Sequence, residues 1–245
     1  MKKYTKTGKA LWLSLLCALN LAHATDDAQA EKLHEMSRAA KAGDVAALQT
    51  LAGTPPDQAL YARLLCRSIA ADNFRAFVAL LDAGADAGYG ERGVRDPGIH
   101  CAVLPPALRA RYLEELLRRG VDVNTRNTLG ETPLHSALGL TKKPFVQIEM
   151  VDMLLAAGAD IHARDKYGKT VLFKAIVGGN PHRDWVMYFL EKGVDPQARS
   201  DMGYTFQFNY LYSTREMKGE GKRRRDKVRQ WLSERGIPLE SDAKK

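Results

Sequence analysis

The sequence predicts an all-α protein, an elongated and concave solenoid of about five to six helix-turn-helix repeats whose β-turns project as fingers. One observation is a stretch at 127–165 that reads as a turn followed by two helices. The other is that the motif ending this stretch, Leu-Leu-x-x-Gly-x-Asp, recurs in variant form around Gly84, Gly120, Gly158, Gly193 and Gly236. These glycines are separated by 36, 38, 35 and 43 residues. Because a helix pair of this size cannot bury its apolar face alone, its repetition predicts a stack in which neighbouring pairs cover one another.

The stretch 127–165 shows how each repeat is built. Asn127 and Gly130 tolerate a positive φ and predict a turn, and Pro133 then suits the first position of a helix, where no N–H is needed. An apolar stripe at helical spacing predicts a second helix and comprises Phe145, Ile148, Val151, Leu154 and Leu155. Gly158 ends that helix.

The start of the first helix carries a family signature. Thr132-Pro133-Leu134-His135-Ser136-Ala137 matches the helix-start motif of ankyrin repeats, and the glycine spacing fits their period of about 33 residues once short insertions are allowed. The chain after residue 30 therefore resembles the ankyrin-repeat family. The resemblance implies one domain over 25–245 with approximate repeats at 31–53, 57–87, 94–124, 127–161, 165–196 and 201–240. We expect His135, and His100 at the matching position, to hydrogen-bond the neighbouring turn.

The other repeats are less regular than this template. The loop from Gly88 to Pro97 is long, and the second helix of the fifth unit and the whole sixth unit are rich in aromatic residues. We expect these deviations to add to partner specificity.

The first 24 residues have the features of a secretory signal peptide. Four lysines precede an apolar run from Ala10 to Ala22, and Ala22-His23-Ala24 offers small residues at the spacing that a signal peptidase needs. The alternative is a membrane anchor, but the run is shorter than the roughly 20 apolar residues that span a bilayer. We expect cleavage near Ala24, a bacterial origin, no stable membrane insertion, and a mature chain in the periplasm or outside the cell.

Export changes the charge balance. The full chain has a net charge of +8, and removal of residues 1–24, which hold four lysines and no acidic residue, leaves +4. The basic run Lys222–Arg229 is compatible with an anionic polymer or lipid. Val228, Trp231 and Leu232 give the same helix an apolar stripe, which favours a solvated C-terminal cap, and export removes the chain from most nucleic acid.

Motifs for catalysis, cofactors and metals are absent from the sequence. The histidines after residue 24 show no pair four residues apart and no cysteine partner at zinc spacing, and there is no P-loop or Gly-x-Ser-x-Gly motif. We therefore predict no metal site, no cofactor, no catalytic residue and no enzymatic activity.

Two cysteines remain after residue 24, Cys66 and Cys101, in the first helices of adjacent repeats. In an oxidising compartment they can form a disulfide. Cysteine is also a common small buried hydrophobe, and both alternatives stay open at this point.

The predicted binding surface follows from the repeat geometry, because turn tips and first helices face the concave side and are free to vary. The predicted partner-binding residues at the turns are Thr128, Leu129, Glu131, Lys166, Tyr167, Lys169, Met202 and Tyr204. Those on the first-helix wall are Ser136 and Lys174. The apolar and aromatic members suit interface hot spots. The alternative is that all are ordinary solvated turn residues.

These features together predict a non-enzymatic protein-binding module that is monomeric when free. Similarity to exported bacterial ankyrin-repeat proteins implies two settings. One is an immunity protein that occludes a toxin effector, such as a type VI lipase effector, and the other is a helper that protects an envelope enzyme. The alternative function is binding of anionic polymer or lipid through the basic C-terminal helix.

Overall fold

The computed structural model describes residues 27–90, 96–104, 110–138, 144–176 and 185–240. The predicted signal peptide at 1–24 and the middle of the loop from Gly88 to Pro97 lie outside these residues. Within the described part of the chain, the regular structure is helical and no strand is present. A helix at 27–42 is followed by α2 (Val45–Ala52), α3 (Gln58–Ala70), α4 (Phe74–Asp82), α5 (Gly98–Val103), α6 (Ala110–Arg118), α7 (Pro133–Ala137), α8 (Pro144–Ala156), α9 (Val171–Ile176), α10 (Trp185–Glu191), α11 (Phe206–Thr214) and α12 (Gly219–Glu234).

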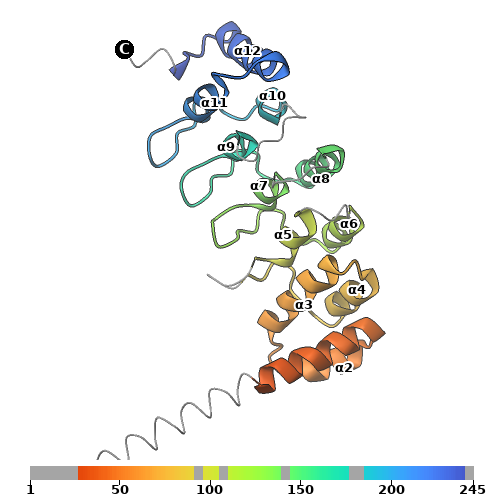
Figure 1. Ribbon diagram of the computed structural model, residues 1–245. Helices are drawn as coiled ribbons and strands as arrows, with labels where there is room; N and C mark the ends of the chain where they lie inside the picture. Colours follow the sequence, from red (N-terminus) through yellow and green to blue (C-terminus); the bar gives the residue numbers. More distant parts are fainter. Residues whose placement is uncertain (1–26, 91–95, 105–109, 139–143, 177–184, 241–245) are drawn as a thin grey trace, which may run out of the picture.

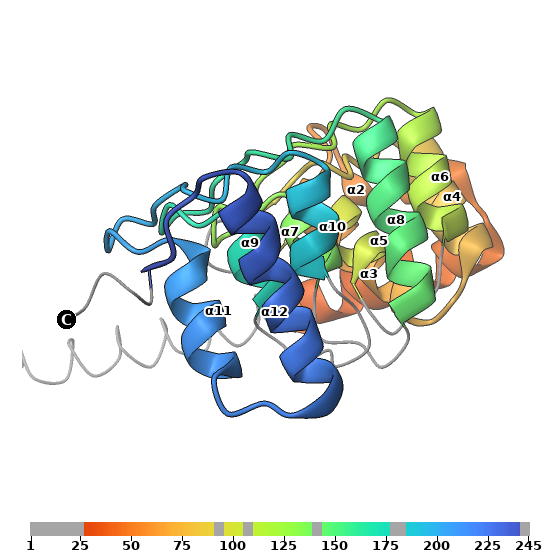
Figure 2. The same cartoon turned by 90° about the horizontal axis from the view of Figure 1, so that it is seen from above.

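The helices form antiparallel pairs that stack along one long axis (Figure 1). The first helices of successive pairs, from α3 through α5, α7 and α9 to α11, form one column, and the second helices form the other. The turns that precede α7, α9 and α11 project from the side of the first column, as the view along the stack also shows (Figure 2). The predicted all-α solenoid is thereby confirmed. None of the described helices has the length and apolar character needed to cross a membrane.

Helix starts follow from local sequence. Asp44, Asp57 and Asn73 are the N-caps of α2, α3 and α4, and each side chain accepts a hydrogen bond from the backbone N–H three residues later, at 2.9, 3.1 and 2.9 Å. Such a bond satisfies a donor that the first helical turn leaves unpaired, which is worth about 1 kcal/mol. α7 begins instead with Thr132 as N-cap and Pro133 at its first position.

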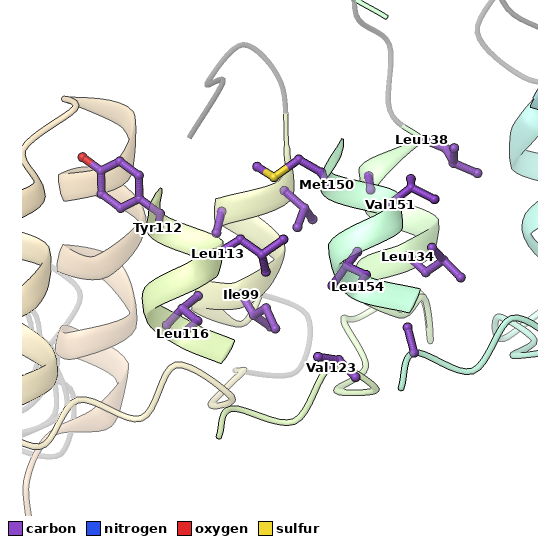
Figure 3. Packing of buried hydrophobic residues seen from close by; sticks show 14 of the residues in the cluster. Ile99, Tyr112, Leu113, Leu116, Val123, Leu134, Leu138, Met150, Val151 and Leu154 are labelled. Carbon is purple, nitrogen blue, oxygen red and sulfur yellow. The ribbon is translucent and has the colours of Figure 1, made fainter. Parts of the chain in front are cut away.

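One apolar core runs through the stack, because each pair is covered by the next. Figure 3 shows this packing between the third and fourth pairs, where the fully buried side chains include Ile99, Leu113, Leu116, Leu134, Val151 and Leu154. Burying one such side chain contributes about 1.5–3 kcal/mol relative to leaving it exposed. The core therefore includes contacts between repeats as well as contacts within each repeat.

The aromatic residues of the fifth pair belong to this core. Trp185 and Phe189 of α10 are buried and stack on each other with ring centroids 5.9 Å apart. Tyr188 is half-buried, and its hydroxyl donates a hydrogen bond of 2.5 Å to Asp152 of α8. The expectation that this helix adds partner specificity is wrong for Trp185 and Phe189, because packing between repeats occupies both rings.

The two cysteines are joined in the structure. Cys66 of α3 and Cys101 of α5 form a disulfide, with their Cα atoms 5.4 Å apart. This bridge links the first helices of the second and third pairs. Of the two alternatives, the structure therefore has the disulfide and not two separate thiols.

The last helix closes the stack. Val228 and Leu232 of α12 are fully buried and join the common core, as predicted for a cap. Arg225, on the same helix, reaches back to the end of α11 and donates hydrogen bonds to the carbonyls of Thr214 and Arg215 at 2.9 and 2.8 Å. Arg225 of the basic run therefore stabilises the packing of α12 against α11 and is not a solvated charge.

Candidate protein-binding groove

Three turns of the same shape, here called fingers, project from the stack at 127–131, 165–169 and 200–204. In the first, the N–H of Gly130 donates to the carbonyl of Asn127 at 2.9 Å, and the Asn127 side chain accepts from the N–H groups of Leu129 and Glu131 at 2.9 and 3.0 Å. Gly130 has φ of 70°, a conformation that favours glycine. Asp165 organises the second finger in the same way.

Backbone hydrogen bonds join neighbouring fingers. The N–H of Lys166 donates to the carbonyl of Leu129 at 3.0 Å, and the N–H of Asp201 donates to the carbonyl of Tyr167 at 2.9 Å. The tips are therefore held at fixed positions relative to one another, although they contain no regular strand.

A ladder of three arginines, Arg126, Arg164 and Arg199, strengthens this arrangement. Arg126 donates to the carbonyl of Gly130 in its own finger at 2.7 Å and to the carbonyl of Arg164 in the next repeat at 2.5 Å. Arg164 repeats the pattern with the carbonyls of Gly168 and Arg199. Arg199 closes the series on Gly203, at 2.6 Å. We call these three residues the arginine ladder.

Buried histidines anchor the fingers to the helices. In His135, Nε2 donates to the carbonyl of Lys169 at 3.3 Å, and Nδ1 accepts from the hydroxyl of Thr132 at 2.9 Å. In His100, Nε2 donates to the carbonyl of Thr125 at 3.2 Å. Burial lowers the pKa of both imidazoles below its ordinary value, because removal from water penalises the charged form. The predicted bonds from these histidines to the turns are confirmed.

A groove of about 490 Å³ lies between the first two fingers and the first helices of the fifth and sixth pairs. We call it the concave groove. Its lining residues are Leu129, Glu131, Asp165, Tyr167, Lys169, Phe173, Lys174, Ile176, Asn209, Tyr212 and Ser213. The fingers form one wall, with Leu129 and Tyr167 at their tips, and α9 and α11 form the other.

An ion pair lies within this groove. A carboxylate oxygen of Glu131 is 2.5 Å from Nζ of Lys174, and the Glu131 side chain is only 8% exposed. The side-chain amide of Asn127 also donates to Glu131, at 3.3 Å. The pair joins the fourth repeat to the fifth and leaves Lys174 half-buried.

Two of the predicted contact residues are buried, and a third, Lys174, is half-buried in the ion pair. Glu131 was expected at an exposed tip and is instead buried, because its carboxylate is held by Lys174. Ser136 was expected on an exposed wall and is also buried, with its hydroxyl donating to Nδ1 of His100 at 2.8 Å. The prediction of a free surface position is wrong for both.

The remaining predicted residues lie at or near the surface. Leu129 is 39% and Tyr167 51% exposed, and the Tyr167 ring has the ammonium groups of Lys166 and Lys169 at 5.1 and 5.6 Å from its centroid. Thr128 is exposed without lining the groove. Their role in binding a partner stays a prediction.

The third finger stands apart from the concave groove. Met202 and Tyr204 are both exposed, and neither contributes to its lining. Tyr204 stacks instead on Phe208, with ring centroids 4.7 Å apart. The structure thus brings the tips of two fingers together on one groove and leaves the third finger beside it.

Sequence reasoning missed the contribution of α11 to this groove. Tyr212 is 62% exposed and lines it together with Asn209. The signal was present in the sequence: Thr205 is the N-cap of α11, just as Thr132 is the N-cap of α7, and Asn209 stands four residues later, as Ser136 does. This correspondence is hard to recognise in the sequence because the sixth repeat diverges from the template.

Comparisons with known proteins agree with this geometry. Residues 99–200 match the family model for ankyrin repeats (3 copies), and this segment covers α5 from its second residue, α6 to α10 and the first two fingers. No curated protein matches the chain. The described residues also hold no group of three or more histidine, cysteine or carboxylate side chains that could bind a metal. The matched repeats and the way the helix pairs stack together show an ankyrin-repeat solenoid, and ankyrin repeats serve as protein–protein interaction modules.

Proposed function

We propose that this protein is a non-enzymatic binding protein that holds a partner protein in the concave groove. The observation that carries the proposal is the exposure of Leu129, Tyr167 and Tyr212 around one groove of about 490 Å³. Exposed apolar side chains that gather on one concave surface are typical of interaction sites, and tyrosine is enriched among interface hot spots.

The rigidity of the fingers supports the same proposal. Binding costs free energy when it immobilises side chains and loops. Here the backbone bonds between fingers and the arginine ladder hold the tips in place before any partner arrives. More of the energy gained from burying Leu129 and Tyr167 is then available as affinity.

We further propose that the protein acts in the periplasm or outside the cell, after removal of residues 1–24. The disulfide between Cys66 and Cys101 suits an oxidising compartment. In that setting the protein would act as an immunity protein that occludes a secreted toxin, such as a type VI lipase effector, or would protect an envelope enzyme.

Binding of an anionic polymer or lipid through α12 is the less favoured function, because acidic neighbours partly neutralise the basic run. Lys222 is 3.2 Å from Asp226, and Arg224 is 3.0 Å from Glu220. Arg225 is engaged with the end of α11. The helix therefore presents less free positive charge than its sequence indicates.

A binding experiment on the captured partner tests the proposed function. The partner is isolated from the native envelope by cross-linking, and its affinity is measured by calorimetry against the Leu129→Ala/Tyr167→Ala double variant. Loss of two hot-spot side chains is expected to weaken binding by at least about tenfold. Met217→Ala is the matched control, because Met217 is exposed but does not line the groove.

Salt dependence separates the two candidate functions. Binding through apolar anchors should change little with ionic strength, whereas binding of a polyanion should weaken steeply as salt rises. An interaction that survives the double variant but is lost on Arg223→Glu and in high salt would refute the concave groove as the binding site.

A further inference from the structure

A second cleft lies beside the concave groove, between α11 and α12. Its volume is about 280 Å³, and one side is apolar, formed by Phe208, Leu211 and Tyr212. Arg215, Arg225, Arg229 and Glu240 complete its lining. We call it the terminal cleft.

We propose that the terminal cleft binds an acidic segment of the partner protein, with a side-chain carboxylate against the arginines and a neighbouring apolar side chain against the α11 wall. This inference rests on the proposed function and extends it, because it names the chemistry of the part of the partner that lies beyond the concave groove.

Arg225 places a fixed positive charge in this cleft. Its side chain is only 14% exposed, and one of its nitrogens donates to the last carbonyls of α11, those of Thr214 and Arg215. The guanidinium also contacts Asp226, at 3.3 Å. Since these bonds hold the group in place, Arg225 contributes a preorganised charge rather than a free donor.

Arg229 supplies the free donor. It lies one helical turn after Arg225, on the same face of α12, and is half-buried. Among the described residues, no hydrogen bond or ion pair of the Arg229 side chain is observed, whereas Arg225 has both. A half-buried cation that lacks a partner is well suited to a carboxylate, which guanidinium binds through two parallel N–H···O bonds.

The other charges around the cleft leave it positive. Arg215 lies over the Tyr212 ring, 4.1 Å from its centroid, and is 3.4 Å from Glu216. Glu240 is the carboxylate in the lining, and it accepts a hydrogen bond from Arg199 at 3.2 Å, so it is already engaged outside the cleft. Arg215, Arg225 and Glu240 thus each have a partner of opposite charge outside the cleft lining, and Arg229 supplies the charge that is not neutralised.

The position of Tyr212 favours a protein segment over a membrane or a polyanion. Tyr212 lines both the concave groove and the terminal cleft, so one extended segment can pass from the first into the second. The most exposed cations of the basic run, Lys222, Arg223 and Lys227, do not line the cleft. A lipid surface or a polymer would meet those residues first, whereas the cleft selects an apolar and acidic side-chain pair.

Two short peptides test the proposal. The probes are the blocked peptides acetyl-Gly-Leu-Glu-Leu-Gly-amide and its Glu→Gln counterpart, titrated against the purified protein while the arginine side-chain resonances are followed by NMR. We expect the acidic peptide to bind about tenfold more tightly than the neutral one, as a charge-assisted hydrogen bond pair requires. Arg229→Gln should remove this preference, while Arg223→Gln, on the exposed side of the same helix, should leave it unchanged.

The outcomes distinguish the alternatives. Equal binding of the two peptides, absence of binding, or equal losses in both arginine variants would overturn the proposal. Peptide binding that is seen only in a variant truncated after Glu240 would identify residues 241–245 as the occupant of the cleft. Binding to anionic vesicles without binding to the peptide would identify the occupant as a lipid. Either result also overturns the proposal. If Arg229→Gln leaves partner affinity intact while Leu129→Ala/Tyr167→Ala abolishes it, the terminal cleft fails as a partner site and the proposed function stands.

Discussion

Removal of the disulfide between α3 and α5 should lower the stability of the N-terminal half of the stack by a calculable amount. Cys66 and Cys101 are 35 residues apart, so the bridge closes a loop of about that length in the unfolded chain. The chain-entropy relation for a loop of this size gives about 3–4 kcal/mol at 25 °C. For a protein of this length, that corresponds to a fall of roughly 10 °C in Tm.

Urea and thermal unfolding, each with and without dithiothreitol, measure this effect. The Cys66→Ala/Cys101→Ala double variant should unfold near the reduced wild-type protein and should not respond to the reductant. Hydrogen exchange should place the lost protection in α3, α5 and their neighbours, because each repeat contacts only the next. Identical unfolding of the oxidised and reduced wild-type protein would refute the reasoning.

Two further predictions concern the fingers. Burial lowers the pKa of His100 and His135 below the ordinary value of 6.5, so below that pH the unfolded chain binds more protons than the folded chain. The free energy of unfolding should have its full value above about pH 6.5 and should decrease as pH falls towards the folded-state pKa values. The His100→Gln/His135→Gln double variant should flatten this slope in urea titrations. Gly130→Ala should destabilise the protein more than Gly203→Ala. Both glycines have positive φ, at 70° and 80°. A Cβ added at Gly130 would lie 2.8 Å from the backbone of the next finger, whereas a Cβ added at Gly203 would meet nothing within 4 Å. Equal losses of Tm for the two alanine variants would contradict this steric argument.

The stack and the finger tips could be predicted from the sequence because their determinants are local. A glycine at the end of each helix pair and an apolar stripe at helical spacing lie within one repeat, so they are visible without knowledge of its neighbours. Leu129 and Tyr167 were found in this way, since both stand two residues after the side chain that organises the turn.

Residues whose role is decided in the adjacent repeat could not be placed. Glu131 has the sequence position of an exposed turn residue, but its carboxylate is buried in an ion pair with Lys174 of the next repeat. Ser136 is likewise bonded by His100 of the preceding repeat. These partners are 43 and 36 residues distant, and nothing within one repeat indicates them.

The C-terminal cap illustrates a second limit. Tyr212 lies in a repeat without the proline and histidine of the template, so its register was not recovered from the sequence. Arg225 was assigned to the solvated face with the rest of the basic run, although its bonds to the end of α11 depend on how two helices meet. The sequence shows that this helix is basic, but only the packing of α12 on α11 shows which of its cations are engaged in the fold and which remain available to a ligand.

In the fingers, the residues of the arginine ladder, which hold the backbone in place, are different from the side chains that the tips offer to a partner. Arg126 and Arg164 bond backbone carbonyls, which every residue carries whatever its side chain. A substitution at Leu129 or Tyr167 therefore changes the chemistry offered to a partner without removing a bond that positions the finger. A new specificity can then arise by exchange of a few tip residues. Duplication of a repeat together with its arginine would lengthen the groove and continue the series of arginine-to-carbonyl hydrogen bonds.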